Sequence, residues 1–165
     1  MKTLFILRHA KSSWDQPGLA DVERPLNKRG LRDAPRMGDW MCQQKLIPDV
    51  IASSPANRAH TTARLVAEAC AYKGEITLVD DFYGQGPQAY LRWLRDLPEE
   101  YSTVLVVGHN PDLEALLTTL TGLEEPLTTA ALAQVKLSVK RWAALTESPA
   151  GKLIKVWRPK ELPKA

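Results

Sequence analysis

Thr3-Leu4-Phe5-Ile6-Leu7-Arg8-His9 is an apolar run that ends in two basic residues near the start of the chain. A continuous apolar run of this length is typical of a strand that is buried on both faces of a sheet. A second run, Val104-Leu105-Val106-Val107-Gly108, also ends on a histidine, His109. Because ligands bind outside the carboxyl ends of strands in open α/β sheets, both histidines are expected to project into a binding site.

Apolar runs and helical patterns alternate along the rest of the chain. The predicted strands are residues 3–8, 49–53, 76–79 and 103–108, with two closing strands at 132–139 and 153–157. The predicted helices are residues 30–46 and 55–71, a third through 90–94, and a fourth that opens at Asn110-Pro111. This alternation predicts an α/β fold, a three-layer α/β/α sandwich whose mostly parallel sheet has an antiparallel edge.

Two of these helices are expected to begin with a capping residue followed by proline. Ser54-Pro55 and Asn110-Pro111 each place a side-chain acceptor before a residue whose φ suits the first helical turn. Both helix starts directly follow a predicted strand. The two helix N-termini are therefore expected to point at the same spot, where they favour anions.

The length and composition of the chain indicate a globular protein of one domain. The 165 residues suffice for one domain, 1–165, and 44% hydrophobic with 25% charged residues is an ordinary globular composition. The chain shows no membrane-spanning run or signal-peptide pattern, and Cys42 and Cys70 are expected to be free thiols, which favours the cytoplasm. A net charge of +3 is too small to indicate nucleic-acid binding. The basic residues of the tail are expected to be solvated: Lys152, Lys155, Arg158, Lys160 and Lys164.

Three predicted strand ends carry residues that suit a phosphoryl group. The first delivers Arg8 and His9, the second delivers Arg58 one turn into the following helix, and the third delivers His109. Guanidinium groups match phosphate oxygens bidentately and keep their charge, and a neutral imidazole is a good nucleophile toward phosphorus. A second histidine, when protonated, can donate to a phosphoryl oxygen in the transition state. No metal is needed, because the arginines neutralise the developing charge.

A zinc site built from the three histidines is the rival interpretation, and the residue pattern disfavours it. Arg8 and Arg58 would repel a cation, and the sequence contains no cluster of metal ligands. His60 lies two positions past Arg58, about 200° around a helix, and is expected to be structural or solvent-exposed. Thr62 lies one turn from Arg58 on the same face and is expected to support the site.

Three segments resemble the signature motifs of the histidine phosphatase (phosphoglycerate mutase-like) superfamily. They are Leu7-Arg8-His9-Ala10-Lys11-Ser12, Ser53-Ser54-Pro55-Ala56-Asn57-Arg58-Ala59-His60-Thr61-Thr62-Ala63 and Val107-Gly108-His109-Asn110-Pro111. Within that superfamily the chain is most similar to the SixA-type phosphohistidine phosphatases. The supporting segments are Arg24-Pro25-Leu26-Asn27-Lys28-Arg29-Gly30, Phe82-Tyr83 and Thr128-Thr129-Ala130. The resemblance covers nearly the whole chain and implies a minimal form of the fold, without a large cap insertion.

The resemblance implies roles that agree with the chemistry of the residues. His9 would be the phosphorylated nucleophile, and Arg8, Arg58 and His109 would complete the phosphate pocket. These four side chains would be both the catalytic groups and, apart from His9, the groups that bind the substrate phosphate.

Two further features of the predicted site have alternative interpretations. Lys11 and Ser12 would add donors to the bound phosphate, or would belong to a solvated loop. The general acid that larger members of the superfamily place over the leaving group has several candidates here. Phosphohistidine needs less help from such an acid than an ester does, because its P–N bond is labile. The candidate carboxylates are Asp80, Asp81, Asp15 and Asp21.

The sequence therefore predicts a metal-independent phosphatase, without a cofactor, that forms a covalent intermediate on His9. We expect it to dephosphorylate phosphohistidine in proteins, because an uncapped site is open to a phosphorylated side chain. One alternative is a phosphatase of the same superfamily for small phosphomonoesters, and another is a non-catalytic phosphate-binding regulatory module. The expected partner is a phosphorylated protein or a small phosphomonoester, with neither nucleic acid nor membrane.

Overall fold

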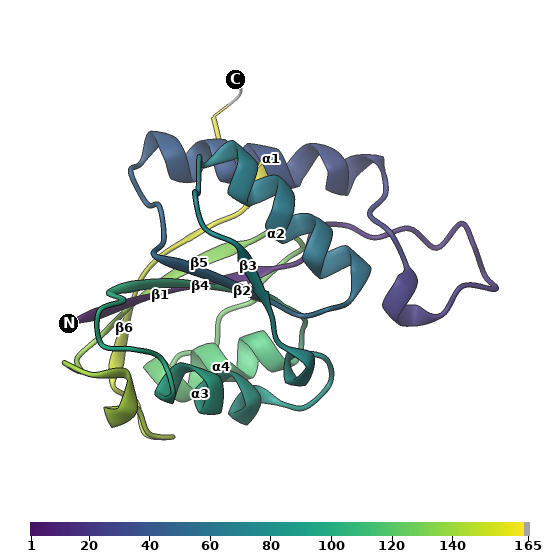
Figure 1. Cartoon of the computed structure of the whole chain (residues 1–165). Coiled ribbons are helices and arrows are strands. Elements are labelled where there is room, and N and C mark those ends of the chain that lie inside the picture. Colours follow the sequence, from purple (N-terminus) through teal and green to yellow (C-terminus); the bar gives the residue numbers. More distant parts are fainter. Residues whose placement is uncertain (164–165) are drawn as a thin grey trace.

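The computed structural model describes residues 1–163, so Lys164 of the predicted basic tail lies outside the described residues. Within residues 1–163, six strands form one sheet in the order β3-β2-β4-β1-β5-β6 (Figure 1). The strands are β1 (Lys2–Arg8), β2 (Val50–Ser53), β3 (Ile76–Leu78), β4 (Thr103–Gly108), β5 (Leu132–Leu137) and β6 (Gly151–Trp157). The helices are α1 (Lys28–Gln43), α2 (Asn57–Ala69), α3 (Pro87–Arg95) and α4 (Asp112–Thr121). Short 3-10 turns are η1 (Asp21–Glu23), η2 (Asp80–Phe82), η3 (Trp142–Ala144) and η4 (Pro159–Glu161).

The sheet has the predicted mixture of strand directions. The pairs β1–β4, β4–β2 and β2–β3 are parallel. Strand β5 is antiparallel to β1, and β6 is antiparallel to β5. Strand β4 lies between β1 and β2, with Arg8 opposite Gly108 and Ser53 opposite Val107. The three strands that precede the predicted site residues are therefore adjacent, and their carboxyl ends meet at one edge.

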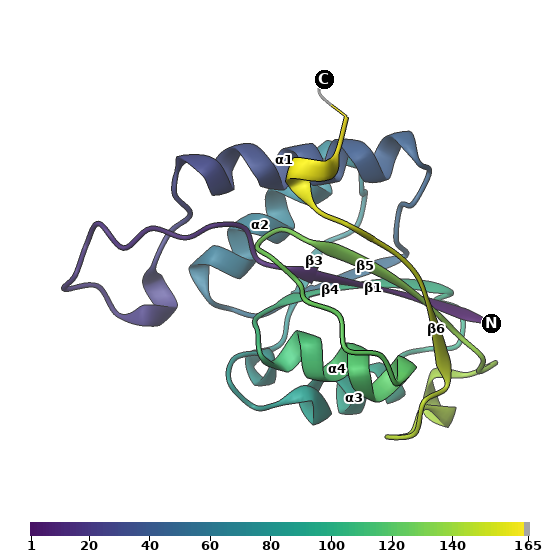
Figure 2. The same ribbon diagram turned by 180° about the vertical axis from the view of Figure 1, so that it is seen from behind.

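Helices cover both faces of the sheet, which confirms the three-layer sandwich. Figures 1 and 2 show α1 and α2 on one face and α3 and α4 on the other. Strand β1 contributes to both cores, because its side chains alternate between faces. Leu4 and Ile6 pack in the core on the α3 and α4 face, and Phe5 and Leu7 pack in the core on the α1 and α2 face. This two-sided burial explains why β1 is apolar throughout rather than alternating.

Both predicted helix starts at proline are wrong. Helix α2 begins at Asn57 with Ala56 as its N-cap, and α4 begins at Asp112 with Pro111 as its N-cap, in each case without a side-chain capping bond. The Ser54 hydroxyl accepts a local bond from the Ala56 N–H at 3.2 Å, and both presumed capping side chains also have other partners. The Ser54 hydroxyl bonds to His109, and the Asn110 amide donates to Glu114 and to the Leu127 carbonyl. The bonds of Ser54 to His109 and of Asn110 to Leu127 span 55 and 17 residues of sequence, whereas the bond to Glu114 lies within the first turn of α4.

The remaining elements differ from expectation only at their ends. Helix α1 starts two residues earlier than predicted, because Asn27 caps it by accepting a bond from the Gly30 N–H at 2.9 Å. It also ends earlier, before Lys45, which adopts the left-handed region at φ 58°. The loop between β1 and α1 extends beyond the ends of the strands (Figure 1). Within residues 1–163, no helix is long and apolar enough to span a membrane, and Cys42 and Cys70 are free thiols.

Candidate active site

His9 follows β1 directly and is held in one orientation. Its backbone N–H donates to the Gly108 carbonyl of β4 at 3.0 Å, and its ring Nδ1 lies 2.7 Å from the Ala10 carbonyl oxygen. A carbonyl oxygen can only accept a hydrogen bond, so Nδ1 carries the proton and Nε2 keeps a lone pair. The residue is 8% exposed. Nε2 is thus the ring nitrogen with a free lone pair, on a nearly buried imidazole.

His109 follows β4 and faces His9 across the strand ends. The two ring centroids are 5.2 Å apart, and the ring of Tyr83 meets His109 edge-on at 5.5 Å. The Nε2 of His109 lies 2.8 Å from the Ser54 hydroxyl oxygen. Gly108, the residue before His109, packs so closely on buried Tyr90 that a Cβ there would overlap the Tyr90 hydroxyl. The sequence motif containing Ser54 therefore supplies a partner for His109 rather than a helix cap.

Both histidines have strongly lowered pKa values. Burial is the largest cause that lowers the pKa of His9, to about 3. The charges of Arg58 and Arg8 lower this pKa further, whereas the bond to the Ala10 carbonyl raises it. Burial also lowers the pKa of His109 to about 4, again with Arg58 contributing. Both rings are therefore neutral near pH 7 in the unliganded site. A neutral His9 is competent as a nucleophile, and a neutral His109 still has one ring N–H to donate.

The lowered pKa values predict how stability depends on pH. Unfolded histidines take up a proton below about pH 6.5, whereas folded His9 and His109 stay neutral until about pH 3 and 4. The stabilising contribution is therefore complete above about pH 6.5 and is lost as the pH falls toward 4. In urea unfolding, the free energy of unfolding of the double variant His9→Asn/His109→Asn should fall less steeply over this range than that of the wild type. A His60→Asn control should keep more of the wild-type slope, and equal slopes in all three proteins would contradict the assignment.

The two predicted phosphate-binding arginines lie at the same edge. Arg58, in the first turn of α2, donates through Nη1 to the Asp21 carbonyl at 2.8 Å and through Nη2 to the Asp21 carboxylate at 3.0 Å. Arg8, the last residue of β1, donates through Nη1 to the Leu127 carbonyl at 3.0 Å. Both arginines are at least half-buried, and burial lowers the pKa of Arg8. Buried guanidinium groups at the strand ends make this edge electropositive.

Thr62 supports the site, as its helical spacing from Arg58 predicts. Its hydroxyl donates to the Arg58 carbonyl at 2.7 Å and accepts a bond from the Ala10 N–H at 2.9 Å. This side chain joins the segment after His9 to helix α2. His60, predicted to be structural or solvent-exposed, is half-buried and contributes none of these contacts.

Among the four candidate acids, the structure brings Asp21 into contact with a predicted phosphate ligand. Its carboxylate accepts bonds from Tyr83 at 2.6 Å, Arg58 at 3.0 Å and Arg24 at 3.2 Å. The Tyr83 bond is the first cause of its lowered pKa, about 2, and the two arginines add to the effect. Asp21 is therefore ionised and serves as the counterion of Arg58 rather than as a proton donor. Asp21 is itself exposed, as are the other three candidates, Asp15, Asp80 and Asp81, but these three form none of the bonds to Arg58, Arg24 or Tyr83.

The residues just past His9 have other partners. Lys11 is exposed, and its carbonyl accepts a bond from the Asn27 N–H at 3.0 Å. The Ser12 hydroxyl accepts a bond from Arg24 at 2.6 Å. The Arg24 guanidinium also stacks on exposed Trp14, with its Cζ 3.3 Å from the ring centroid. Ser12 thus helps to hold the loop between β1 and α1. A direct contact of either side chain with phosphate stays a prediction.

His9 and His109 lie close together, but in the part of the chain that the structure describes they do not form part of a metal-ligand cluster. Within residues 1–163, no three side chains of the His, Cys, Asp and Glu types are placed to hold a metal ion. The site described here consists of two imidazoles, two guanidinium groups and the carboxylate of Asp21. Sequence reasoning placed Ser54 at this strand end as a helix cap and Asp21 in the loop as a candidate acid. It did not predict the bond of Ser54 to His109, the pairing of Asp21 with Arg58, or the contact of Tyr83 with His109.

Known proteins that are similar to this chain identify its family. Residues 4–83 match the histidine phosphatase superfamily (branch 1). A Mycobacterium tuberculosis protein of uncharacterised function is 34% identical over 118 residues, which is 71% of each chain. An Agrobacterium tumefaciens protein assigned as a SixA phosphohistidine phosphatase is 28% identical, with a TM-score of 0.82 over 96% of this chain and 98% of the other. A SixA protein histidine phosphatase complexed with tungstate, 24% identical, shares the fold with a TM-score of 0.84 over 98% and 99% of the two chains. Together these matches establish that the chain belongs to the histidine phosphatase superfamily.

Proposed function

We propose that this protein is a phosphatase that removes the phosphoryl group from phosphohistidine in proteins, through a covalent intermediate on Nε2 of His9. The bond between His9 Nδ1 and the Ala10 carbonyl carries this proposal. It selects the tautomer whose free lone pair lies on Nε2. A neutral, oriented imidazole among guanidinium groups is what attack on phosphorus requires.

In the first step, the lone pair of His9 Nε2 forms a bond to phosphorus while the bond from phosphorus to the substrate imidazole breaks. The leaving imidazole takes a proton from solvent on its second nitrogen and departs neutral. His9 becomes a phosphorylated imidazolium that still holds its Nδ1 proton against the Ala10 carbonyl. Water then attacks the same phosphorus and releases inorganic phosphate, which returns His9 to its neutral form.

Buried polar atoms around His9 support the assignment of the phosphate ligands. Within residues 1–163, Arg8 Nε and His109 Nδ1 are buried without a hydrogen-bond partner. Buried polar groups in folded proteins almost always have a partner. A phosphoryl oxygen between the two histidines would supply an acceptor for Arg8 and, in the Nδ1–H tautomer, for His109. Arg58 would share its two donor groups between the phosphate and Asp21.

The state of the carboxylates favours a phosphoramidate over an ester as the substrate. Asp21 has a pKa of about 2 and is ionised, so it cannot donate a proton to an alkoxide leaving group near neutral pH. Within residues 1–163, none of the hydrogen bonds made by the side chains of His9, Arg58 and His109 involves the carboxylate of Asp15, Asp80 or Asp81. An imidazole leaving group needs no such donor, because solvent can protonate its second nitrogen.

An assay of three substrate types tests this proposal. The enzyme is given a protein phosphorylated on histidine, a small phosphomonoester and a generic aryl phosphate, with release of inorganic phosphate as the readout. We expect kcat/KM to be highest for the phosphohistidine protein by at least about tenfold, a difference of about 1.4 kcal/mol in barrier. A preference for the phosphomonoester would favour the small-molecule alternative. Tight binding of the phosphorylated protein without turnover would favour a non-catalytic regulatory module.

A further inference from the structure

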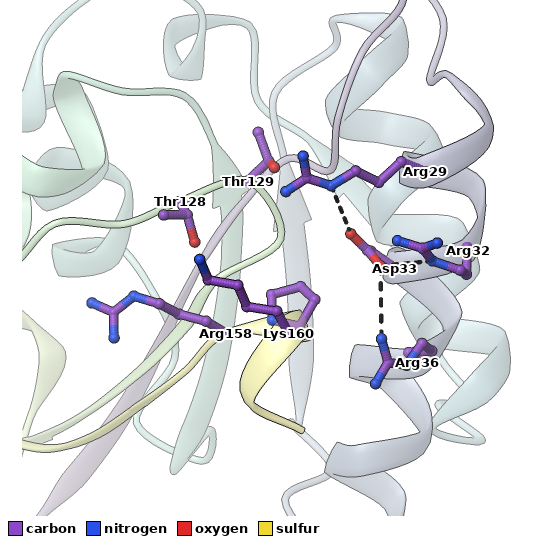
Figure 3. Close-up of a pocket in the computed structure, with 9 residues that line it drawn as sticks. Arg29, Arg32, Asp33, Arg36, Thr128, Thr129, Arg158 and Lys160 are labelled. Carbon is purple, nitrogen blue, oxygen red and sulfur yellow. Dashed lines mark hydrogen bonds and ion pairs between the residues drawn. The ribbon is translucent and has the colours of Figure 1, made fainter. Parts of the chain in front are cut away.

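A basic pocket of about 360 Å³ lies outside the phosphate site, between helix α1 and the segments that precede β5 and follow β6 (Figure 3). One wall is formed by α1 residues Arg29, Arg32, Asp33 and Arg36. Thr129 and Lys160 belong to the opposite side. None of these residues takes part in the phosphoryl transfer to and from His9.

One buried carboxylate forms ion pairs with all three α1 arginines of the basic pocket. The Asp33 side chain, 3% exposed, lies 3.5 Å from Arg29, 3.3 Å from Arg32 and 4.0 Å from Arg36. Like charges at this helical spacing repel one another. Asp33 therefore orients the three guanidinium groups on one face of the helix but neutralises only one of their charges.

Lys160 adds a fourth cation to the basic pocket. Its side chain extends toward Thr128 (Figure 3), and within residues 1–163 no carboxylate forms an ion pair with it. Arg158 differs, because it is paired with Glu125 at 2.9 Å and lies 3.7 Å from Glu161. The uncompensated positive charge thus comes from Lys160 and the α1 arginines.

The wall of the basic pocket is continuous with the segment that carries the nucleophile. Thr129 precedes Ala130, whose N–H lies 3.1 Å from the carbonyl oxygens of both Arg8 and His9. Arg29 precedes Gly30, which packs so closely on the Lys11 carbonyl that a Cβ would overlap it. Both contacts place the pocket beside the strand ends where the phosphate site lies. A protein whose phosphorylated side chain reaches His9 is therefore also within reach of the basic pocket.

We propose that the basic pocket binds carboxylate side chains of the phosphorylated protein, next to its phosphohistidine. This inference rests on the proposed function and deepens it, because it names the surface chemistry of the substrate. From Arg29 to Arg36 the guanidinium row spans about 10 Å of helix. Arg29 and Arg32 are 55% and 64% exposed. A row of this length with solvent-exposed heads fits an acidic segment of a protein better than a single enclosed ion.

The double variant Arg32→Gln/Lys160→Gln tests this proposal with little risk to folding. Both side chains are exposed, and Asp33 keeps Arg29 and Arg36 as partners. The matched control is Lys73→Gln/Lys140→Gln, which removes two exposed charges. Lys73 precedes β3 and Lys140 follows β5, so both lie at the opposite edge of the sheet from the strand ends of the site.

The readouts are kcat and KM for two substrates, a phosphohistidine protein with flanking acidic residues and the free amino acid phosphohistidine. We expect the pocket variant to raise KM for the protein about 3- to 10-fold with kcat unchanged, because exposed charges act mainly on association. Its activity on free phosphohistidine and both activities of the control should match the wild type. Added salt should reduce kcat/KM for the protein more in the wild type than in the pocket variant.

The possible failures are distinguishable. A wild type inactive on both phosphohistidine substrates would overturn the proposed function and the docking proposal with it. An active wild type whose pocket variant has the same KM for the protein would overturn the docking proposal alone. An equal loss on the protein and on free phosphohistidine would also overturn it, and would point to a small free anion in the pocket instead.

Discussion

Replacement of His9 by asparagine is expected to lower kcat by about 10⁴-fold or more, because the nucleophile of a covalent mechanism has no substitute. The effect should be on chemistry rather than on binding. Arg8, Arg58 and His109 remain in the variant, so the phosphorylated protein should still bind. The measurement is single-turnover release of phosphate from a phosphohistidine protein, together with a direct binding titration.

The matched control for this variant is His60→Asn. His60 is also a histidine and lies two residues past Arg58, but its half-buried side chain takes part in none of the hydrogen bonds described for His9, Arg58 and His109. It should retain activity within about twofold of the wild type. Turnover by His9→Asn at a rate close to that of the control would mean that another group, or water itself, attacks phosphorus.

Replacement of Arg58 by glutamine is expected to lower kcat/KM by about 10²- to 10³-fold, equivalent to about 2.7–4 kcal/mol of transition-state stabilisation. Arg58 is 8% exposed and places both of its terminal nitrogens toward the loop that faces the site. The loss should appear in kcat as well as in KM, because charge on the phosphoryl oxygens is redistributed in the transition state.

The Arg58 variant has a second readout that reports on the mechanism of its effect. Arg58 is one of the groups that lower the pKa of Asp21, so this pKa should rise in Arg58→Gln and can be followed by NMR titration. The matched control is Arg64→Gln on the same helix, where the arginine is exposed and its removal should change neither quantity. An Arg58→Gln enzyme with wild-type kcat/KM would remove Arg58 from the phosphate pocket.

The central strands could be predicted because their own residues determine their environment. Strands β1 and β4 lie in the middle of the sheet with helices on both faces, so they must be apolar at every position, as Leu4 to Leu7 and Val104 to Val107 are. A histidine at the end of each such strand then falls at the same edge. The pairing of His9 with His109 was therefore predictable from two short segments.

The helix starts could not be predicted from local preference. Ser54 and Asn110 are good capping residues, but each finds a partner that only the tertiary fold provides. Ser54 bonds to His109, 55 residues away, and Asn110 bonds to the Leu127 carbonyl. Helix α2 begins two residues later than predicted and α4 one residue later, in each case without a side-chain bond from the N-cap residue.

The role of Asp21 also depends on tertiary contacts that the sequence does not reveal. Its place in the loop after His9 made it a candidate acid, but its contacts with Arg58 and Tyr83 span 37 and 62 residues of sequence. These contacts lower its pKa and turn a candidate proton donor into a counterion. No sequence spacing carries that information, because it depends on how the loop folds over the strand ends.

Transfer of the phosphoryl group to Nε2 of His9 is the central claim, and rapid-quench trapping tests it most directly. The enzyme is mixed with a protein that carries a radiolabelled phosphohistidine, the reaction is stopped in base, which preserves phosphohistidine, and the labelled enzyme is digested and sequenced by mass spectrometry. The mechanism predicts a transient label on His9, attached at Nε2, in the wild type and no label in His9→Asn. Release of labelled phosphate in the first turnover without any label on His9 would contradict it.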